Sequence, residues 1–367
     1  MPGASAEPVT AGDLLTLQEL AYFRRTSSLR GAGLVLHAWG TIAGVTALYL
    51  LWPSALTLGV AVVMIGARQL GLMVLMHEAA HWLLFPHGRA NTWVGTWLCG
   101  APVGADLRAY RRRHHLHHRH TQQPEDPDLG LAKPFPVSRA RLWRMLLGDL
   151  CGWTAVTRIV AWRPSPEGLS ATWRRARAPI VSNAVLFTVL TTVGGPQLYL
   201  LGWVLPWATW YQVATRVRDI AEHGMVPSLD DPLRNTRTIG AGFLARLVLA
   251  PYWVNHHLEH HVFVFVPCWK LRRVHALLLA KDLGERMERA ASYAGVIGRA
   301  TVSVPPPARA TPTSLLGLVL GAVLLTACSG VPVPPAYTQD ELAARCARTG
   351  GWWHPGTLID GYCEYRN

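Results

Sequence analysis

The segment HEAAH, residues 77–81, ends a long apolar run, and two further histidine-rich segments follow it: HHLHH, residues 114–118, and NHHLEHH, residues 255–261. In a helix, residues three and four apart share one face, so each segment predicts a helix that presents several imidazoles in one direction. The histidines with this spacing are His77, His81, His114, His117, His118, His257, His260 and His261. A further histidine, His223 in RDIAEHG, stands alone before the third segment.

The composition around these segments is typical of a membrane protein. Half of the 367 residues are hydrophobic, 16% are charged and the mean hydropathy is +0.18, whereas an average soluble domain has roughly 25% charged residues. The net charge of +13 comes mainly from arginines that stand between the apolar runs, as the positive-inside rule expects of cytoplasmic loops. We therefore predict a membrane protein without a nucleic-acid partner.

Four apolar runs predict four transmembrane helices in two hairpins: residues 31–52, 55–85, 179–193 and 197–215. A shorter apolar stretch, residues 91–104, predicts a re-entrant or interfacial piece. The arginine-rich stretches 106–177 and 216–300 would then lie on the cytoplasmic side. We predict an all-α membrane protein in which a cytoplasmic helical cap carries the histidine segments.

Imidazoles gathered at one membrane face favour a metal site. Imidazole is a good ligand for iron, copper and zinc, and buried imidazoles near a membrane need partners. One zinc ion takes only four ligands, so eight histidines in three segments indicate two metal ions. HEAAH also matches the HExxH pattern of zinc proteases, with Glu78 as the base, but that reading leaves the other segments unexplained. A membrane metal transporter is a further alternative, although it would need ligands inside the spans.

The order and spacing of the three segments resemble the histidine boxes of the membrane fatty acid desaturase superfamily, which includes hydroxylases and ketolases. The likeness extends roughly over residues 15–295 and includes the arginines before the second box and NHHLEHHVFVFVPCWKL around the third. It implies a centre of two iron ions held by nine histidines: His77, His81, His114, His117, His118, His223, His257, His260 and His261. It also places Asp219 where some relatives have an asparagine that holds a metal-bound water.

Several carboxylates adjoin the boxes in sequence. Glu78, Glu222 and Glu259 each neighbour an implied ligand, and Asp126 follows the second box. We predict that these carboxylates, above all Glu222 and Asp126, orient imidazoles; the alternatives are a surface position or, for Asp126, a helix cap. Three other histidines are predicted to be structural or interfacial: His37, His87 and His275.

The resemblance implies an oxidoreductase that uses O2 and two irons to introduce a double bond into an acyl chain, as an acyl-lipid or fatty acid desaturase does. Its electrons would come from a separate donor of ferredoxin or rubredoxin type and a reductase, because the sequence shows no donor domain. The alternative is a hydroxylase or ketolase acting on a carotenoid, sterol or alkane, since these enzymes share the ligands and differ in pocket shape.

The C-terminal part has a different character. Residues 1–300 are predicted to form the desaturase-like domain, residues 301–312 a proline-rich linker and residues 313–367 an apolar segment with a small tail. The stretch LTAC, residues 325–328, resembles a bacterial lipoprotein lipobox. We predict an extra apolar helix from Ser314 that crosses the bacterial inner membrane outward, so that Cys346 and Cys363 could pair in the periplasm while the active site faces the cytoplasm.

Overall fold

The computed structural model describes residues 11–132, 134–302, 352–354 and 362–364. The chain divides into two units, Met1–Val304 and Pro305–Asn367. In the second unit the described part is an antiparallel pair of strands, β5 (Trp352–His354) and β6 (Tyr362–Glu364). The predicted apolar helix, the lipobox and the Cys346 half of the predicted disulfide lie outside the described residues.

Within the described residues, three helices are long and apolar enough to cross a membrane: α3 (Ser28–Leu51), α4 (Ala55–Ala80) and α10 (Leu169–Gly194). Hydroxyl groups cap the first two, because Ser27 accepts from the amide of Arg30 and Ser54 from that of Thr57, amides that a first helical turn leaves free. In the most apolar 18-residue part of each helix, 61% of the residues are buried in α4, but only 17% in α3 and 11% in α10. α4 therefore forms the centre of the bundle, and the other two helices present most of their apolar surface outward.

The predicted fourth span, residues 197–215, is an irregular helical run and not a single α-helix. It consists of α11 (Pro196–Tyr199), the π-helix η3 (Leu200–Val204), α12 (Leu205–Ala208) and α13 (Trp210–His223). Pro206 has no amide proton to donate, and Thr209 has a non-helical backbone with φ −117° and ψ −89°. Gln69 of α4 holds the run by donating to the carbonyl of Trp203 at 2.9 Å. Three spans are thus confirmed by length and composition, and the fourth stays a prediction.

The part of the chain between α4 and α10, which includes the arginine-rich stretch 106–177, is largely helical. It contains α5 (Gly88–Val94), the π-helix η1 (Gly95–Gly100), the 3-10 helix η2 (Ala101–Val103), α6 (Leu107–Arg119), α7 (Leu129–Ala132), the strand β1 (Val137–Ser138), α8 (Arg139–Leu150) and α9 (Trp153–Val160). The predicted re-entrant piece, residues 91–104, corresponds to α5, η1 and η2, which pack against α4.

The start of α10 corrects the predicted boundary at Pro179. The helix begins at Leu169, so Arg174, Arg175 and Arg177 lie on a helix rather than in a polar loop. A proline inside a helix has no N–H, so the carbonyl four residues before it loses its usual hydrogen bond. The helix nevertheless continues through Pro179 to Gly194, and Asn183, one turn later, donates its side-chain amide to the carbonyl of Pro179 at 3.0 Å.

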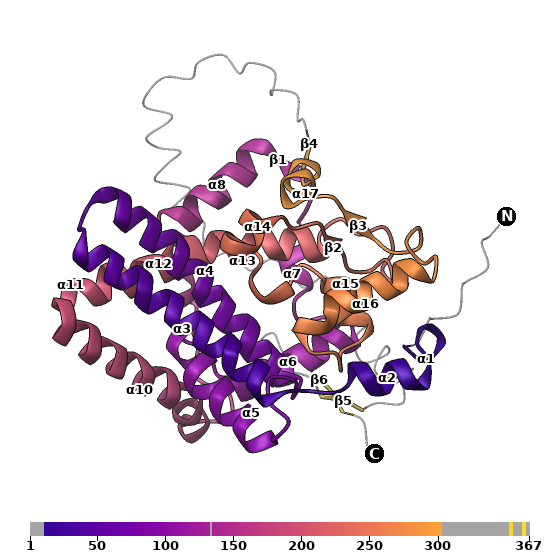
Figure 1. Cartoon of the computed structure of the whole chain (residues 1–367), viewed down its shortest axis with the longest axis horizontal. Helices are drawn as coiled ribbons and strands as arrows, with labels where there is room; N and C mark the ends of the chain where they lie inside the picture. Colours follow the sequence, from indigo (N-terminus) through magenta and orange to yellow (C-terminus); the bar gives the residue numbers. More distant parts are fainter. Residues whose placement is uncertain (1–10, 133, 303–351, 355–361, 365–367) are drawn as a thin grey trace, which may run out of the picture. The chain divides into compact units, whose positions relative to one another are not determined.

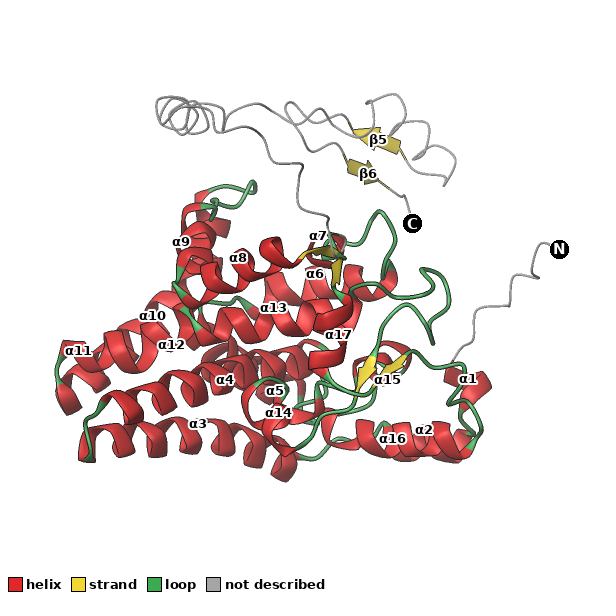
Figure 2. Cartoon of the chain, turned by 90° about the horizontal axis from the view of Figure 1, so that it is seen from above, coloured by secondary structure: helices red, strands yellow, loops and turns green. Residues whose placement is uncertain are grey.

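The residues after α13 complete the cap. They contain β2 (Thr238–Ile239), α14 (Phe243–Val248), the 3-10 helix η4 (Pro251–Trp253), α15 (His257–Val262), α16 (Cys268–Ala280), β3 (Arg289–Ala290), α17 (Tyr293–Arg299) and β4 (Thr301–Val302). Two short parallel pairings link parts of the cap: β1 pairs with β4, and β2 pairs with β3. α1 (Ala11–Leu14) and α2 (Leu17–Phe23) precede α3. Figures 1 and 2 both place α11 and the α3–α4 loop at one end of this unit and α15, α16 and α2 at the other.

Candidate metal centre

Four helices bring the nine predicted ligands together where α4 ends. His77 lies in the last turn of α4, His81 is the C-cap residue of that helix, and His223 is the last residue of α13. The other six come from two helices, with His114, His117 and His118 on α6 and His257, His260 and His261 on α15.

Arg111 fixes the second box against the end of the first. Its Nε donates to the carbonyl of Ala80 at 3.0 Å and its Nη2 to that of Ala79 at 2.8 Å, while its guanidinium lies 3.8 Å from the ring centre of Trp82. The last carbonyls of a helix lack partners within the helix and carry the negative end of its dipole. The cation therefore satisfies these carbonyls and holds α6 in place relative to α4.

The first group, which we call group 1, contains five histidines whose ligand nitrogens all lie within 4.8 Å of one another: His77, His81, His114, His118 and His260. His118 Nε2 lies 2.9 Å from His114 Nε2 and 3.0 Å from His260 Nε2. The Nε2 atoms of His77 and His81 are buried without a hydrogen-bond partner. A neutral imidazole has only one N–H, so protons alone cannot satisfy this many converging nitrogens, and a metal ion could.

The second group, group 2, contains four histidines within the same distance limit: His117, His223, His257 and His261. His257 Nε2 lies 2.8 Å from His223 Nε2 and 3.0 Å from His261 Nε2. Both α6 and α15 contribute to both groups, so two helices position both candidate metal sites at once.

Hydrogen bonds on Nδ1 orient two rings of group 2. His117 Nδ1 lies 2.8 Å from Asp126 Oδ1, and both side chains are buried. The hydroxyl of Thr121 donates to the carbonyl of His117 at 2.8 Å, so its oxygen can accept from His261 Nδ1 at 3.2 Å. A proton on Nδ1 leaves the lone pair on Nε2. This geometry suits the role predicted for Asp126; Thr121 was not predicted, and its only sequence signal is its place three residues after the second box.

Burial favours the neutral form of six of these imidazoles, which lie outside the spanning helices. It lowers their pKa well below the ordinary value for histidine, and nearby positive groups lower it further; the six are His114, His118, His223, His257, His260 and His261. A neutral imidazole keeps the lone pair that a metal ion needs. These six imidazoles are therefore prepared to bind a metal without first losing protons.

Two predicted carboxylates lie on α13 beside group 2. Glu222 is 3.5 Å from His257 Nδ1, and its two oxygens accept from Arg218 at 2.8 Å and 2.5 Å. Burial raises the pKa of Glu222 to about 7 and that of Asp219 to about 6, although Arg218 opposes both shifts. Asp219 lines the cavity described below but belongs to neither histidine group. The Arg218–Glu222 ion pair was not predicted, although its i,i+4 spacing signals it.

The other two carboxylates bond mainly away from the ligand nitrogens. Glu259 is fully buried and accepts from Thr238 and, at 2.5 Å, from His275. Glu78 accepts from the amide of Cys268 at 2.8 Å and lies 3.5 Å from His77 Nδ1. Both therefore brace the third box and α16, and His275 has a structural position as predicted.

A cavity of about 260 Å³ adjoins both groups. Five of the nine histidines line it: His77, His114, His117, His223 and His257. Its lining is apolar where α4 contributes Leu70, Met73 and Val74, and it also includes the polar side chains of Tyr211, Thr215, Asp219 and Arg158. A substrate in this cavity would lie directly against the imidazoles of both groups.

The chain is similar to a desaturase and to two carotenoid ketolases. A relative from Bradyrhizobium elkanii, a dihydrorhizobitoxine desaturase, is 29% identical over 294 residues, which cover 74% of this chain and 81% of the relative. A beta-carotene ketolase from Paracoccus sp. strain PC1 is 25% identical over 275 residues, covering 73% of this chain and 95% of the relative. A second beta-carotene ketolase, from Paracoccus sp. strain N81106, is 24% identical over 207 residues, covering 55% and 72%.

These relatives indicate an oxidoreductase, and the three apolar helices agree with a membrane protein. The model of the family described as fatty acid desaturase matches residues 50–289, a range that includes all nine histidines. The chain therefore belongs to the fatty acid desaturase family.

Proposed function

We propose that this protein is an oxygen-dependent desaturase that uses two iron ions to introduce a double bond into an acyl chain. The supporting observation is the convergence of nine buried or half-buried imidazoles in two groups, five and four, beside one cavity. Imidazole ligands suit iron, and oxidation of an unactivated C–H bond requires redox chemistry that zinc does not supply.

The nitrogens of the two groups fit metal ions on structural grounds. Group 1 holds the unpartnered Nε2 atoms of His77 and His81, which would cost free energy if they stayed unsatisfied. Its five nitrogens exceed the four that a zinc site normally takes. In group 2, Asp126 and Thr121 hold protons on Nδ1 so that Nε2 can ligate. When bound, the two irons would supply the oxygen-dependent oxidation.

The remaining cavity residues would position the substrate. The apolar wall of α4, formed by Leu70, Met73 and Val74, suits the methylene groups of an acyl chain, and its contact with the histidine groups would bring two adjacent carbons to the reacting centre. Removal of one hydrogen from each carbon gives the double bond. One O2, two electrons and two further protons then complete the formation of two water molecules.

The electrons are proposed to come from a separate ferredoxin or rubredoxin type donor with its reductase. The proposed location is the bacterial inner membrane, with both histidine groups on the cytoplasmic side. The supporting observation is the arginine-rich character of the helices that surround them, because arginine accumulates on the cytoplasmic side of membrane proteins.

Metal analysis and lipid profiling test this proposal together. We expect about two irons and little zinc per purified chain, because the ligand set is all imidazole in two groups. Aerated cells that express the chain should contain a new unsaturated acyl chain, and unaerated cells or cells with a His118→Ala variant should not. Stoichiometric zinc without iron contradicts the metal assignment; unchanged acyl chains with iron present contradict the substrate.

A carotenoid ketolase is the second candidate, because the Paracoccus relatives with that name match up to 73% of this chain. The same cells, supplied with beta-carotene, distinguish the two candidates. A carotenoid that gains oxygen while the acyl profile stays unchanged would replace desaturation by ketolation.

A further inference from the structure

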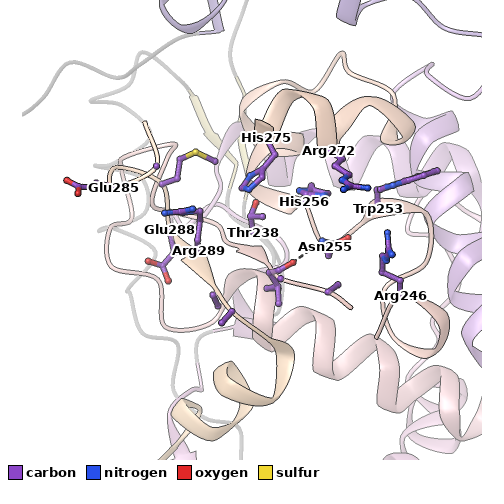
Figure 3. Close-up of a pocket in the computed structure, with 17 residues that line it drawn as sticks. Thr238, Arg246, Trp253, Asn255, His256, Arg272, His275, Glu285, Glu288 and Arg289 are labelled. Atoms are coloured by element: carbon purple, nitrogen blue, oxygen red, sulfur yellow. Dashed lines mark hydrogen bonds between the residues drawn. The ribbon is translucent and has the colours of Figure 1, made fainter. Parts of the chain in front are cut away.

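A larger cavity, of about 710 Å³, lies in the cap and is lined by none of the nine histidines. Its walls come from β2, η4, α16 and the segment 284–291 that contains β3. Figure 3 shows Arg246, Arg272, Trp253 and His256 on one side of this cavity. No part of the proposed reaction uses it.

The cavity has more unpaired positive than unpaired negative side chains. Arg246, Arg272 and Arg289 line it, and none of these guanidinium groups has a hydrogen bond or ion pair among the described residues. Of the two carboxylates that line it, Glu288 accepts from Arg237 at 2.7 Å, whereas Glu285 has no ion-pair partner among the described residues and lies at the far edge in Figure 3. Arginine presents several fixed donors that match a phosphate group, so the cavity is suited to an anion.

A buried donor adds to these cations. His256 lines the cavity with only 9% of its surface exposed, and its Nδ1 is buried without a hydrogen-bond partner. The fully buried Glu259 is 3.8 Å from this nitrogen but is already bonded to Thr238 and His275. A buried polar nitrogen without a partner is costly, and an anion in the cavity could accept from it.

Arg246, one of the lining residues of this cavity, comes from α14, a helix that packs beside the spanning helix α4. Arg68 of the spanning helix α4 donates to the carbonyl of Leu247 at 2.7 Å, so α14 lies roughly 20 Å along α4 from Ala55 at 1.5 Å per residue. The hydrocarbon core of a bilayer is about 30 Å thick. Phe243 and Leu244 of α14 are 75% and 68% exposed, as expected of side chains that contact lipid, while Arg246 on the same helix lines the cavity.

We propose that this cavity binds the phosphate of an anionic phospholipid, held by Arg246, Arg272 and His256. The acyl chains of that lipid would lie beside Phe243 and Leu244 in the leaflet that α14 contacts. The arginines bind the phosphate and the exposed apolar residues select a lipid over a free anion. The site is separate from the histidine groups and does not depend on the reaction proposed above.

Native mass spectrometry of the detergent-purified chain, titrated with short-chain phosphatidylglycerol, tests the proposal. An Arg246→Gln/Arg272→Gln variant should bind this lipid at least about ten-fold more weakly than the wild type, because charge-assisted hydrogen bonds to phosphate are lost. Arg234→Gln/Arg286→Gln is the matched control, since it removes the same charge from exposed arginines outside the cavity. Its affinity should equal that of the wild type.

A variant that has lost its metal is taken not to have folded. If the Arg246→Gln/Arg272→Gln variant does not fold, the single variant Arg272→Gln replaces it in the titration. Equal lipid affinity in the wild type and the folded cavity variant would overturn the proposal. Inorganic phosphate that displaces the lipid mole for mole would overturn the choice of a lipid over a free anion. Phosphatidylcholine, which carries no net charge, should bind more weakly than phosphatidylglycerol. Metal content and activity are measured on the same variants. If both stay at the wild-type level, the outcome of the lipid titration says nothing against the proposed reaction.

Discussion

Group 1 and group 2 differ in what remains after the loss of one imidazole. His118→Ala leaves four histidines in group 1, whereas His261→Ala leaves three in group 2. We expect both variants to lose activity by about 100-fold or more, because ligand geometry controls the reactivity of a metal. The His261→Ala chain should lose more iron, since three imidazoles bind more weakly than four. Iron per chain and activity, measured on the same preparations, check both points.

His87→Ala is the matched control for these variants. His87 is exposed at the start of α5 and makes no capping hydrogen bond there, so iron content and activity should stay at the wild-type level. His275→Ala is not equivalent, because it would leave the buried Glu259 without one of its partners. Full activity of His118→Ala or His261→Ala would show that the altered histidine is not a required ligand.

A substitution of Asp126 tests how strongly the hydrogen-bond partner of a ligand histidine affects iron binding. The buried carboxylate of Asp126 accepts from His117 Nδ1 at 2.8 Å; Asp126→Asn keeps the shape but removes the charge. We expect about 10- to 100-fold weaker iron binding at group 2, as is typical when such a partner is changed. Asp128→Asn, at a more exposed carboxylate paired with Arg113, should have a smaller effect. Chelator titration of the two variants measures the difference, and equal iron retention would exclude a positioning role for Asp126.

At the scale of elements, the π-helix η1 packs unusually closely on the helix that ends in the first box. A Cβ at Gly95 would lie 2.4 Å from the Cβ of Ala79, two residues before His81. Gly95→Ala should therefore lower the free energy of unfolding by about 1–3 kcal/mol through overpacking. Gly40→Ala on the outer face of α3, where nothing lies within 4 Å, should be neutral or slightly stabilising. Thermal unfolding in detergent compares them, and equal melting temperatures would contradict this packing argument.

The helices that could be predicted from the sequence are those with a local signal. The apolar runs gave α3 and α4 to within a few residues, and the i,i+3 and i,i+4 spacing placed the boxes on α6 and α15. The start of α10 was wrong because Pro179 was taken as a boundary, although the helix continues through it. The division of 197–215 at Thr209 was missed, although Pro206, three residues earlier, is a local signal for an interrupted helix.

At the scale of the whole molecule, the sequence predicted which histidines would meet but not how they divide. The relative rotation of α6 and α15 decides which histidine joins which group. It places His118 and His260 in group 1, and His117 and His261 in group 2. That rotation is set by long-range contacts such as Arg111 on the end of α4 and Thr121 on His261. Such contacts join residues far apart in the chain and leave no periodic signal in the sequence.

The division of the chain leads to a last prediction. All nine histidines, both cavities and every cap helix belong to the unit Met1–Val304. Its last described residues also have a structural role, because β4 (Thr301–Val302) pairs with β1 and the amide of Val137 donates to the carbonyl of Ala300 at 2.9 Å. Deletion of residues 310–367 keeps this pairing, so iron content and activity should match those of the full chain.

A deletion from residue 298 onward is the matched comparison, because it removes β4 and the end of α17. Without these, the cluster that packs Val137 and Ala300 near Ile220 loses a member, and Ile220 precedes His223 by one turn of α13. This shorter chain should lose stability and part of its iron. If the 310–367 deletion folds and holds iron but has lost its activity, the C-terminal residues take part in catalysis and the site does not belong to the first unit alone.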